Sequence, residues 1–299
     1  QPEVLYRCYA KINLTLEILG RRDDGYHDLA SLVHTISLAD DLRIEHATEL
    51  LTRVEGLDID PETNLVARAA ELLTSTTGER RGAELSLVKR IPAAAGLGGG
   101  SSDAATTLVG LNALWNSHLS VADLTRLAAD LGSDIPFFVR GGAAVMRGRG
   151  EQLEAVPPLG GQWFVILVPP HDVLDKTRWL YTALEASDFS SGETTEAAAD
   201  VLRRRQALDV THLVNGFERA ARSVFPGLSA TWAEAQRLAA RPFFLSGAGP
   251  AVFALASDRA DARRQAARLA QLGSAHAART VRHARASLKF AAETSIGYS

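Results

Sequence analysis

Several features that are typical of secreted, membrane or nucleic-acid-binding proteins are scarce in this sequence, and cysteine is the first of them. Its 299 residues include a single cysteine, Cys8, so no disulfide can form within the chain. The residues beside it, Arg7 and Tyr9, do not suggest a metal site. Because a lone cysteine fits a reducing compartment, we expect a cytoplasmic protein.

Long apolar runs are missing too. No stretch approaches the roughly 18 apolar residues expected of a membrane-spanning helix. The N-terminus lacks the basic and then apolar layout of a signal peptide. We therefore expect no association with a membrane. The chain begins with Gln rather than Met, so we expect further residues upstream of it.

Charge of one sign is not in excess. The 32 Lys and Arg residues and the 35 Asp and Glu residues are interleaved along the chain, and the formal net charge is -3. A nucleic-acid-binding domain usually has a concentrated basic patch, which this pattern does not provide. We therefore expect no binding of nucleic acid, and the sequence gives no sign of an obligatory protein partner.

What remains is the composition of a globular protein, with 46% hydrophobic and 22% charged residues. Apolar and polar residues alternate from Val4 to Ile18, which predicts a half-buried strand with Lys11 and Asn13 on its non-core face. Other patterns predict strands over 42–46, 83–89, 143–146 and 163–168, two strands joined by a glycine turn over 243–255, and helices over 62–74, 102–115, 120–131, 197–208, 231–240 and 258–272.

Pairs of proline and glycine indicate where the chain divides. Pro157-Pro158 and Gly160-Gly161 interrupt the pattern of strands and helices. We therefore place a domain boundary near residue 156, with an N-terminal domain of residues 1–156 and a C-terminal domain of residues 157–299. The segment 187–195 is built of small and polar residues, which predicts a mobile surface loop.

A glycine-rich loop is the most informative motif. It lies between a predicted strand and a predicted helix, where bare backbone can approach a ligand and the N–H groups of the helix start favour an anion. It lacks the Gly-Lys-Ser/Thr of a Walker loop and fits the dinucleotide fingerprint poorly. A phosphate loop is favoured, and a flexible tight turn is the structural alternative. The loop residues are Pro92, Ala93, Ala94, Ala95, Gly96, Leu97, Gly98, Gly99, Gly100, Ser101 and Ser102.

This loop resembles the phosphate loop of the GHMP kinase superfamily, which follows the pattern Pro-x-x-x-Gly-Leu-Gly-Gly/Ser-Gly/Ser-Ser. Four more blocks resemble the branch of that superfamily that phosphorylates 4-diphosphocytidyl-2-C-methyl-D-erythritol, and they occur in the same order over nearly the whole chain. These blocks are Tyr9-Ala10-Lys11-Ile12-Asn13-Leu14, Arg22-Asp23-Asp24-Gly25-Tyr26-His27, Leu131-Gly132-Ser133-Asp134-Ile135-Pro136-Phe137-Phe138 and Leu245-Ser246-Gly247-Ala248-Gly249-Pro250. Any one block is a weak signal, whereas the combination is specific.

The resemblance implies an α+β fold of two domains with the active site in the cleft between them, ATP as co-substrate, and Mg2+ bound with the ATP. It assigns Asp134 as the base that accepts the proton of the substrate hydroxyl and Lys11 as the cation beside it. Without the resemblance, Asp134 would be interpreted as a turn or capping residue and Lys11 as a solvated lysine. The sequence offers no convincing carboxylate cluster for the metal, so its ligands stay open, with Ser102 as one candidate contact.

The resemblance also implies how the two ligands are recognised. Tyr26 and His27 would bind the cytosine of a substrate with a cytidine diphosphate group, by stacking and by hydrogen bonds. The other residues that it assigns are Asn13, Thr177 and Tyr181 for the substrate, Asn64 and Lys89 near the adenine, and Ser246, Gly247, Ala248 and Gly249 in a turn that closes the site beside the phosphate loop. On pattern alone, Asn64 would start a helix, Lys89 would be a strand-end charge, and residues 246–249 would be a hairpin turn.

Three other functions stay open at this point. The nearest is a GHMP kinase for another small alcohol, such as homoserine or a mevalonate derivative, against which the Gly25-Tyr26-His27 block argues. A catalytically silent nucleotide-binding or regulatory protein is less consistent with the presence of both Lys11 and Asp134. A dehydrogenase would need the dinucleotide fingerprint. We therefore expect a kinase that phosphorylates the 2-hydroxyl of 4-diphosphocytidyl-2-C-methyl-D-erythritol in the non-mevalonate isoprenoid pathway.

Overall fold

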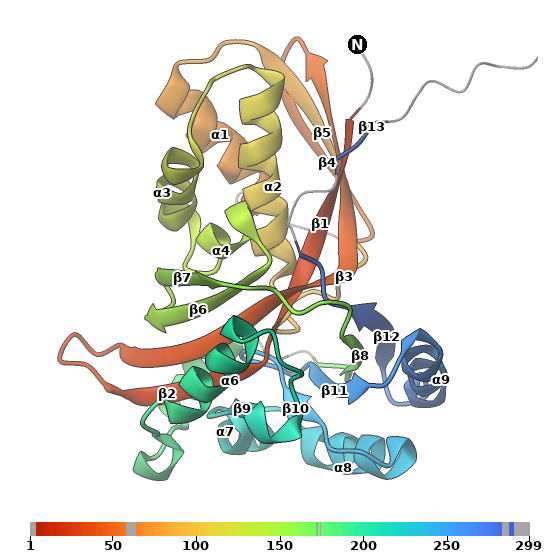
Figure 1. Cartoon of the computed structure of the whole chain (residues 1–299). Coiled ribbons are helices and arrows are strands. Elements are labelled where there is room, and N and C mark those ends of the chain that lie inside the picture. Colours follow the sequence, from red (N-terminus) through yellow and green to blue (C-terminus); the bar gives the residue numbers. More distant parts are fainter. Residues whose placement is uncertain (1–3, 58–63, 172, 174, 283–286, 290–299) are drawn as a thin grey trace, which may run out of the picture.

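The computed structural model describes residues 4–57, 64–171, 173, 175–282 and 287–289. Within them the strands form two sheets, and helices cover both, as Figure 1 shows. The expected α+β fold is confirmed. None of the helices in the described part of the chain is long and apolar enough to cross a membrane.

One long strand, β3, is the axis of the larger sheet. The nine strands of this sheet, within the described residues, are β1 (Val4–Asn13), β2 (Thr15–Arg21), β3 (His27–Ala47), β4 (Leu50–Glu55), β5 (Gly82–Val88), β6 (Ala143–Gly148), β7 (Gln152–Val156), β9 (Val214–Asn215) and β13 (Ser287–Lys289). β3 has 21 residues, which corresponds to roughly 70 Å of extended chain. It therefore runs from the upper to the lower half of the molecule (Figure 1), with β1 and β2 paired along one edge and β5 and β6 along the other.

The predicted strand from Val4 to Ile18 is confirmed, with a break at Leu14 that divides it into β1 and β2. Its non-core face is not solvated, however, because Lys11 and Asn13 are only 5% and 4% exposed. On the other face, Ile12 packs in a core that is shared with the smaller sheet. The strand is thus buried on both faces, which alternation in the sequence does not reveal, because a buried polar site has the same pattern as a solvated surface.

Four helices cover one face of the larger sheet, namely α1 (Leu65–Thr77), α2 (Gly99–Leu114), α3 (Val121–Leu131) and α4 (Ile135–Arg140). α2 contacts β1 and β3, and apolar residues of all four helices join one core. The predicted ends of α3 are confirmed, since Ser120 and Asp123 form a reciprocal capping box and Gly132 follows the last residue. The predicted helix over 62–74 is confirmed from Leu65 onward, and residues 62 and 63 lie outside the described residues.

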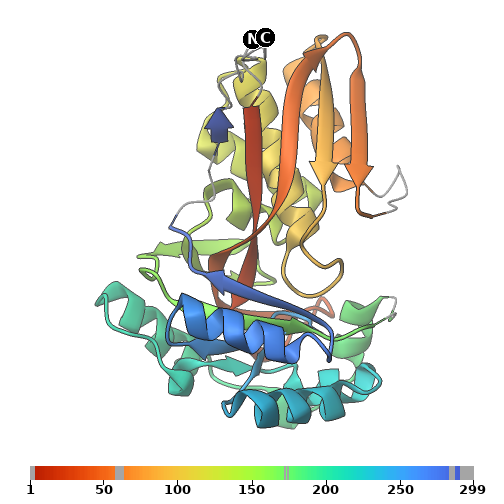
Figure 2. The same cartoon turned by 90° about the vertical axis from the view of Figure 1, so that its right-hand side faces the viewer.

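The smaller sheet is antiparallel and lies across the lower half of the molecule. Its strands are β8 (Trp163–Val168), β10 (Phe244–Leu245), β11 (Val252–Ala256) and β12 (Ser274–Arg279), in the order β10-β11-β8-β12. Phe164 and Phe253 on one face join a core with β1 and β3, while Val165 and Val252 on the other face pack with helices. Figure 2 shows α9 lying along this sheet. The helices of this half are α5 (Lys176–Thr182), α6 (Glu193–Arg203), α7 (Glu218–Val224), α8 (Leu228–Ala239) and α9 (Arg259–Leu269), with 3-10 turns at Ala186–Asp188 and Val210–His212.

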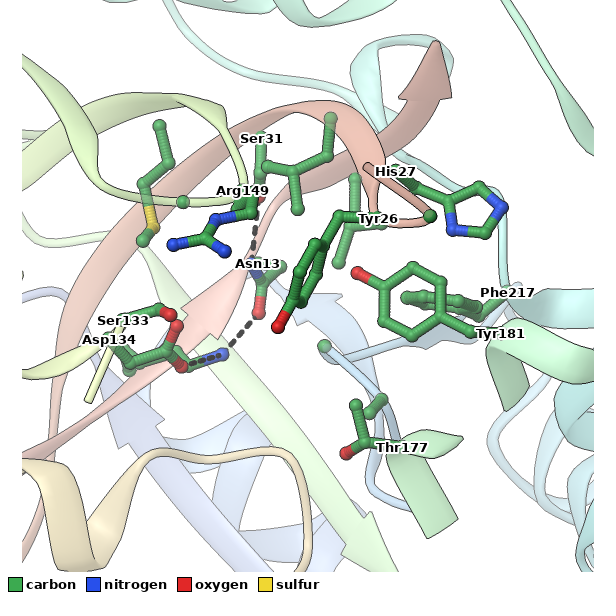
Figure 3. A pocket seen from close by; sticks show the side chains of 18 residues that line it. Asn13, Tyr26, His27, Ser31, Ser133, Asp134, Arg149, Thr177, Tyr181 and Phe217 are labelled. Atoms are coloured by element: carbon green, nitrogen blue, oxygen red, sulfur yellow. Dashed lines mark hydrogen bonds and ion pairs between the residues drawn. The ribbon is translucent and has the colours of Figure 1, made fainter. Parts of the chain in front are cut away.

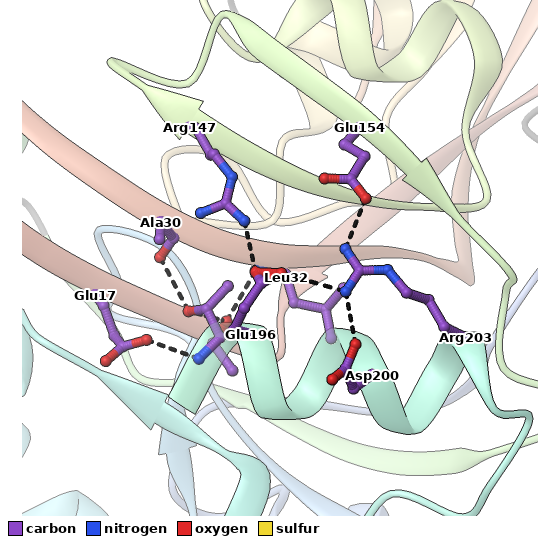
Figure 4. Close-up of polar contacts among 10 residues, drawn as sticks. Glu17, Ala30, Leu32, Arg147, Glu154, Glu196, Asp200 and Arg203 are labelled. Carbon is purple, nitrogen blue, oxygen red and sulfur yellow. Dashed lines mark hydrogen bonds and ion pairs between the residues drawn. The ribbon is translucent and has the colours of Figure 1, made fainter. Parts of the chain in front are cut away.

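Helix α6 is held to the β2–β3 hairpin by polar contacts (Figure 4). The Glu17 carboxylate accepts hydrogen bonds from the Thr195 N–H at 2.7 Å and from the Ser190 hydroxyl at 3.0 Å. The predicted loop over 187–195 is therefore wrong at its C-terminal end, where residues 193–195 begin α6 and Thr195 is fully buried. A carboxylate at the start of the helix satisfies a free N–H group and interacts well with the helix dipole. On the same helix, Arg203 forms ion pairs with the carboxylates of Glu154, Glu196 and Asp200.

The second half of the chain completes the sheet of the first half. β7 ends at Val156 in the larger sheet, and β8 starts at Trp163 in the smaller one. β9 and β13 then return to the larger sheet, where they pair with β2 and β1. These two strands were not predicted, because segments of two or three residues are too short to show a period.

A buried histidine ties β3 to the connection between β7 and β8. His34 has no exposed surface. Its Nδ1 donates to the Thr35 carbonyl at 2.8 Å, and its Nε2 accepts from the Leu159 N–H at 2.9 Å, so both ring nitrogens are satisfied in the neutral form. Burial lowers the pKa of His34 to about 4.

We expect His34 to make the stability of the fold depend on pH. The folded-state pKa of about 4 lies below the ordinary value of 6.5, so the stabilising contribution is complete above pH 6.5 and is lost as the pH falls from 6.5 toward 4. Between pH 7.5 and pH 5 this one residue should remove about 2 kcal/mol from the free energy of unfolding. Urea unfolding should show that His34→Gln loses less stability over this interval than the wild type, by about that amount.

The matched control for this prediction is His46→Gln, because His46 is exposed on the same strand. That variant should keep the pH dependence of the wild type. Equal losses of stability in wild type and His34→Gln between pH 7.5 and pH 5 would contradict the prediction.

Candidate active site

Two neighbouring cavities lie beside β1 and the glycine loop. The larger cavity, of about 610 Å³, is bordered by β1, the start of β3, the turn before α4, and α5. The smaller cavity, of about 350 Å³, is bordered by the glycine loop and the first turns of α1 and α2. Their linings touch at Lys11, because Gly98 of the smaller cavity packs against this residue of the larger one: a methyl group added to Gly98 would lie 3.0 Å from Lys11 Cγ.

The predicted site residues are divided between these cavities. The larger cavity is lined by Lys11, Asn13, Tyr26, His27, Asp134, Thr177, Tyr181, Gly247 and Ala248, and the smaller one by Asn64, Lys89, Pro92, Ala93, Ala94, Ala95, Gly96, Gly98, Gly99, Gly100 and Ser101. Four predicted residues are buried and line neither cavity, namely Leu97, Ser102, Ser246 and Gly249. The sequence thus predicts which segments form the site. Which residues of the glycine loop face the cavity and which are buried depends on the backbone conformation of the loop.

Lys11 and Asp134 form the polar centre of the larger cavity. Figure 3 shows Asp134 on the same side of this cavity as Asn13. Lys11 Nζ lies 3.6 Å from Asp134 Oδ2 and donates to Asn13 Oδ1 at 2.5 Å. Asn13 Nδ2 in turn donates to Ser31 Oγ at 2.8 Å. Lys11 is almost fully buried, whereas the Asp134 side chain is 44% exposed and precedes α4. A fixed cation therefore stands beside a carboxylate that a ligand in the cavity can reach.

Aromatic rings form the opposite wall of the larger cavity. The rings of His27 and Tyr181 are stacked with centroids 4.9 Å apart, and Phe217 meets Tyr181 edge to face, also at 4.9 Å. Tyr26 is 56% exposed, and the Arg149 guanidinium lies 4.5 Å from the centre of its ring. Burial, followed by the charge of Arg21, lowers the pKa of His27. At neutral pH, His27 can therefore both donate and accept a hydrogen bond.

The glycine loop is shaped by its contact with the turn at residues 246–249. A methyl group added to Gly96 would lie 2.2 Å from the Ser246 carbonyl oxygen, and Gly96 has a φ of +87°. The Ser246 hydroxyl donates to the Gly96 carbonyl at 3.2 Å. Gly98 at φ +71° then starts α2 at Gly99, three residues before the predicted start. The unpaired N–H groups of the first turn of α2 thus border the smaller cavity, where they favour an anion.

Lys89 has charged partners in the protein. Its Nζ lies 2.5 Å from Asp40 Oδ2 and 2.7 Å from Asp103 Oδ2. Asp40 Oδ1 also accepts from the N–H groups of Arg90 and Ile91. Burial raises the pKa of Asp103 to about 7, against the effect of Lys89. The cluster therefore fixes the strand before the glycine loop to the helix after it.

Asn64 is the N-cap of α1, where its side chain accepts from the Val66 N–H at 3.0 Å. This is the structural interpretation that the sequence left open, although Asn64 also lines the smaller cavity. A second role in ligand binding stays a prediction for both Asn64 and Lys89.

Several residues of the site were missed from the sequence. Ser31, Ser133, Arg149 and Phe217 line the larger cavity, and Asp103 lines the smaller one. Asp103 directly follows the glycine loop, and Arg149 lies between two glycines, so position in the sequence could have indicated both. Phe217 comes from a distant segment and has no such signal.

The described residues include no group of three or more His, Cys, Asp or Glu side chains that could hold a metal ion. The carboxylates in the linings of the two cavities are Asp134 and Asp103.

The chain is similar to known kinases over most of its length. The model of the "GHMP kinases N terminal domain" matches residues 64–142, and that of "GHMP kinases C terminal" matches residues 193–275. A protein of Dehalococcoides mccartyi named 4-diphosphocytidyl-2-C-methyl-D-erythritol kinase is 41% identical over 251 residues, which cover 84% of this chain and 88% of the relative. A protein of the same name from Pelotomaculum thermopropionicum is 42% identical and covers 87% of this chain and 91% of its own length.

Solved structures give the same result. A crystal structure of 4-(cytidine 5'-diphospho)-2C-methyl-D-erythritol kinase superposes with a TM-score of 0.80 at 37% identity and covers 92% of this chain and 98% of its own. Homoserine kinase from Cytophaga hutchinsonii superposes with a TM-score of 0.69 over 96% of this chain and 98% of its own. Its identity of 18% limits that likeness to the fold.

Proposed function

Because this chain belongs to the GHMP kinases, and within them to the family of 4-diphosphocytidyl-2-C-methyl-D-erythritol kinases, we propose that it transfers the γ-phosphoryl group of ATP to the 2-hydroxyl of that compound. The enzyme is an ATP-dependent phosphotransferase with an alcohol as acceptor. The observation that supports the proposed reaction best is the Lys11–Asp134 pair, 3.6 Å apart in the larger cavity, with Lys11 packed against Gly98 of the smaller one.

ATP would occupy the smaller cavity and the acceptor the larger one. Backbone N–H groups at the start of α2 suit the phosphates, and the apolar start of α1 suits the adenine. The γ-phosphate would then face Lys11, whose own N–H donates to the Leu97 carbonyl of the glycine loop at 2.9 Å. This arrangement would bring the attacking hydroxyl and the phosphorus together beside Lys11, where the linings of the two cavities touch, and such positioning is most of what phosphoryl transfer requires.

The proposed roles of the residues follow from their charges. Asp134 accepts the proton of the hydroxyl as its oxygen attacks phosphorus. Lys11 stabilises the negative charge of the attacking oxygen and of the transferring group. Asn13 holds the Lys11 ammonium through its Oδ1 and is itself held by Ser31. The pair is therefore positioned before the substrate arrives.

We also propose that Mg2+ binds with ATP, where it would neutralise charge on the phosphates. The Ser101 hydroxyl in the lining of the smaller cavity would suit a hard cation, and Ser102 is buried beside it, while the Asp103 carboxylate is already paired with Lys89. Mg2+ usually keeps several waters and takes few protein ligands beside phosphates, so a dedicated carboxylate cluster is not required.

The aromatic wall is the proposed site of the cytosine. Tyr181 and Tyr26 offer ring faces for a planar base, and a neutral His27 can read its polar edge. Arg149 and Thr177 are polar groups on the same cavity and would contact the diphosphate and the sugar. We propose a cytoplasmic reaction, consistent with the buried free thiol of Cys8, and the 1–156 and 157–299 division as the two domains that form the cleft.

The test is ADP release from Mg-ATP with purified protein and three acceptors at equal concentration: 4-diphosphocytidyl-2-C-methyl-D-erythritol, homoserine and mevalonate phosphate. The cytidine compound should be turned over selectively. Turnover of another alcohol would keep the kinase and replace the substrate, and ATP binding without any turnover would favour a regulatory protein.

The aromatic wall gives a further prediction. Tyr181→Ala should raise KM for the cytidine substrate by roughly 10- to 100-fold, because stacking is worth about 1–3 kcal/mol per base, while kcat changes little. Tyr181→Phe should behave as the wild type, since it keeps the ring and loses only the hydroxyl. Steady-state kinetics at saturating ATP measures both variants. A normal KM in Tyr181→Ala would rule out the ring as a platform for the base.

A further inference from the structure

Lysine is rare in this chain and is concentrated at the site. Only four of the 32 basic residues are lysine. The three whose side chains the structure describes are Lys11, Lys89 and Lys176. Lys11 lines the larger cavity and Lys89 the smaller one, and Lys176 donates to the carbonyl of Ala94, which lines the smaller one. Lys11 and Lys89 have the carboxylate partners given above. Lys176 has no carboxylate partner among the described residues and is not one of the residues given a role in the reaction above.

Lys176 connects three segments of the site. It is the first residue of α5, and its Nζ donates to the carbonyl of Ala94 in the glycine loop and to that of Gly249 in the turn beside it. Ala94 lines the smaller cavity, and Thr177, the next residue along α5, lines the larger one. The Lys176 ammonium therefore lies between the linings of the two cavities and near enough to Lys11 to feel its charge.

The charge of Lys176 is less well compensated than that of the other two lysines. Its acceptors among the described residues are neutral carbonyls, whereas Lys11 has the Asp134 carboxylate. Burial, with a smaller effect of the Lys11 charge, lowers the pKa of Lys176 to about 8. The charged groups around Lys11 are thus two ammonium ions, its own and that of Lys176, and one carboxylate, Asp134. An anion placed between them would relieve the repulsion.

We propose that Lys176 contacts the phosphoryl group that is transferred and stabilises its charge in the transition state. This inference rests on the proposed function. In the step, the acceptor oxygen forms a bond to Pγ, the bond from Pγ to the bridging oxygen of ADP breaks, and Asp134 takes the hydroxyl proton. Lys176 exchanges no proton. Of the three N–H donors of an ammonium, two are directed at the carbonyls of Ala94 and Gly249, which leaves one for a phosphate oxygen.

The alternative role of Lys176 is a clamp that only holds the glycine loop against the 246–249 turn. The two roles differ in what they affect. A clamp shapes the nucleotide cavity, so its loss should weaken ADP and ATP equally and lower the melting temperature. A phosphoryl contact acts where ATP and ADP differ, so its loss should weaken ATP selectively and lower kcat.

The experiment compares wild type with Lys176→Met, which keeps the length and removes the charge, and with Arg178→Met, which removes an exposed cation from the same helix. Calorimetry should show that Lys176→Met binds a non-hydrolysable ATP analogue at least about tenfold more weakly than wild type, which is about 1.4 kcal/mol, with little change for ADP. Its kcat should fall by roughly 100-fold, as for other lost transition-state donors. Arg178→Met should match the wild type in both measurements.

A pH profile provides a second readout. Wild-type kcat/KM for ATP should decline above pH 8 as Lys176 loses its proton. The kcat/KM of Lys176→Arg, whatever its value at pH 7, should not show this decline, because a guanidinium stays charged at higher pH. Normal kcat in Lys176→Met, or equal loss of ADP and analogue affinity, would overturn the proposal. The calorimetric comparison needs no acceptor, so it stays decisive even if the acceptor is not the cytidine compound.

Discussion

Replacing Asp134 with Asn should abolish most of the turnover and leave the nucleotide site intact. An amide of the same shape cannot accept the hydroxyl proton, and general acid–base catalysis contributes roughly 10²- to 10⁴-fold to rates. We expect kcat to fall by about 10³-fold, with ADP affinity unchanged. Asp134 lines only the larger cavity, and the phosphates would be held by the glycine loop of the smaller one. Single-turnover kinetics and calorimetry with ADP measure the two quantities separately.

The control for Asp134→Asn is Asp130→Asn. Asp130 is exposed on the preceding helix, α3, and lines neither cavity. That variant should keep wild-type kinetics. This result would show that the loss of turnover in Asp134→Asn does not come from removing any carboxylate in this region. Near-normal turnover of Asp134→Asn would withdraw the role of base from this residue and leave the Lys11 cation as the principal catalytic group.

The sequence predicts those parts of the site that are local in the chain. The glycine loop, the capping box at Ser120 and Asp123, and the Ser133-Asp134 turn are each specified by a few consecutive residues, because backbone conformation there depends on short-range sterics and hydrogen bonds. The segments so predicted do meet in two cavities. Their roles in binding and catalysis stay predictions.

The parts that could not be predicted depend on contacts between distant segments. Asn13 has the pattern of a solvated strand residue and is buried because the 246–249 turn and Ser31 cover it. Lys176 lies 82 residues from Ala94 and 73 from Gly249 in the chain, yet donates to both. Thr195 belongs to a polar stretch and is buried because Glu17 accepts its N–H. In each case the tertiary fold decides whether a polar side chain faces water or protein.

The second large effect should come from Lys11, where shape matters as much as charge. Lys11→Met keeps the length of the side chain, removes the ammonium, and should lower kcat by roughly 10²- to 10³-fold, the usual loss for one transition-state donor. Of the two partners left behind, Asp134 is 44% exposed and can be hydrated, whereas the buried Asn13 Oδ1 loses its donor. We therefore expect the variant to fold with a free energy of unfolding lowered by about 1–3 kcal/mol. Thermal unfolding checks that point, and steady-state kinetics checks the rate.

Lys11→Arg separates the role of the ammonium from that of charge alone. The space around Lys11 is closed by two glycines: a methyl group added to Gly247 would lie 3.1 Å from Lys11 Nζ, and one added to Gly98 would lie 3.0 Å from its Cγ. A guanidinium is broader than an ammonium and would push against this backbone. We therefore expect Lys11→Arg to be nearly as inactive as Lys11→Met although it keeps the charge, and to bind ADP more weakly because it displaces the glycine loop. If kcat of Lys11→Arg lies within about tenfold of the wild-type value, a positive charge at this position is sufficient. The close packing around Lys11 would then have no part in positioning it for catalysis.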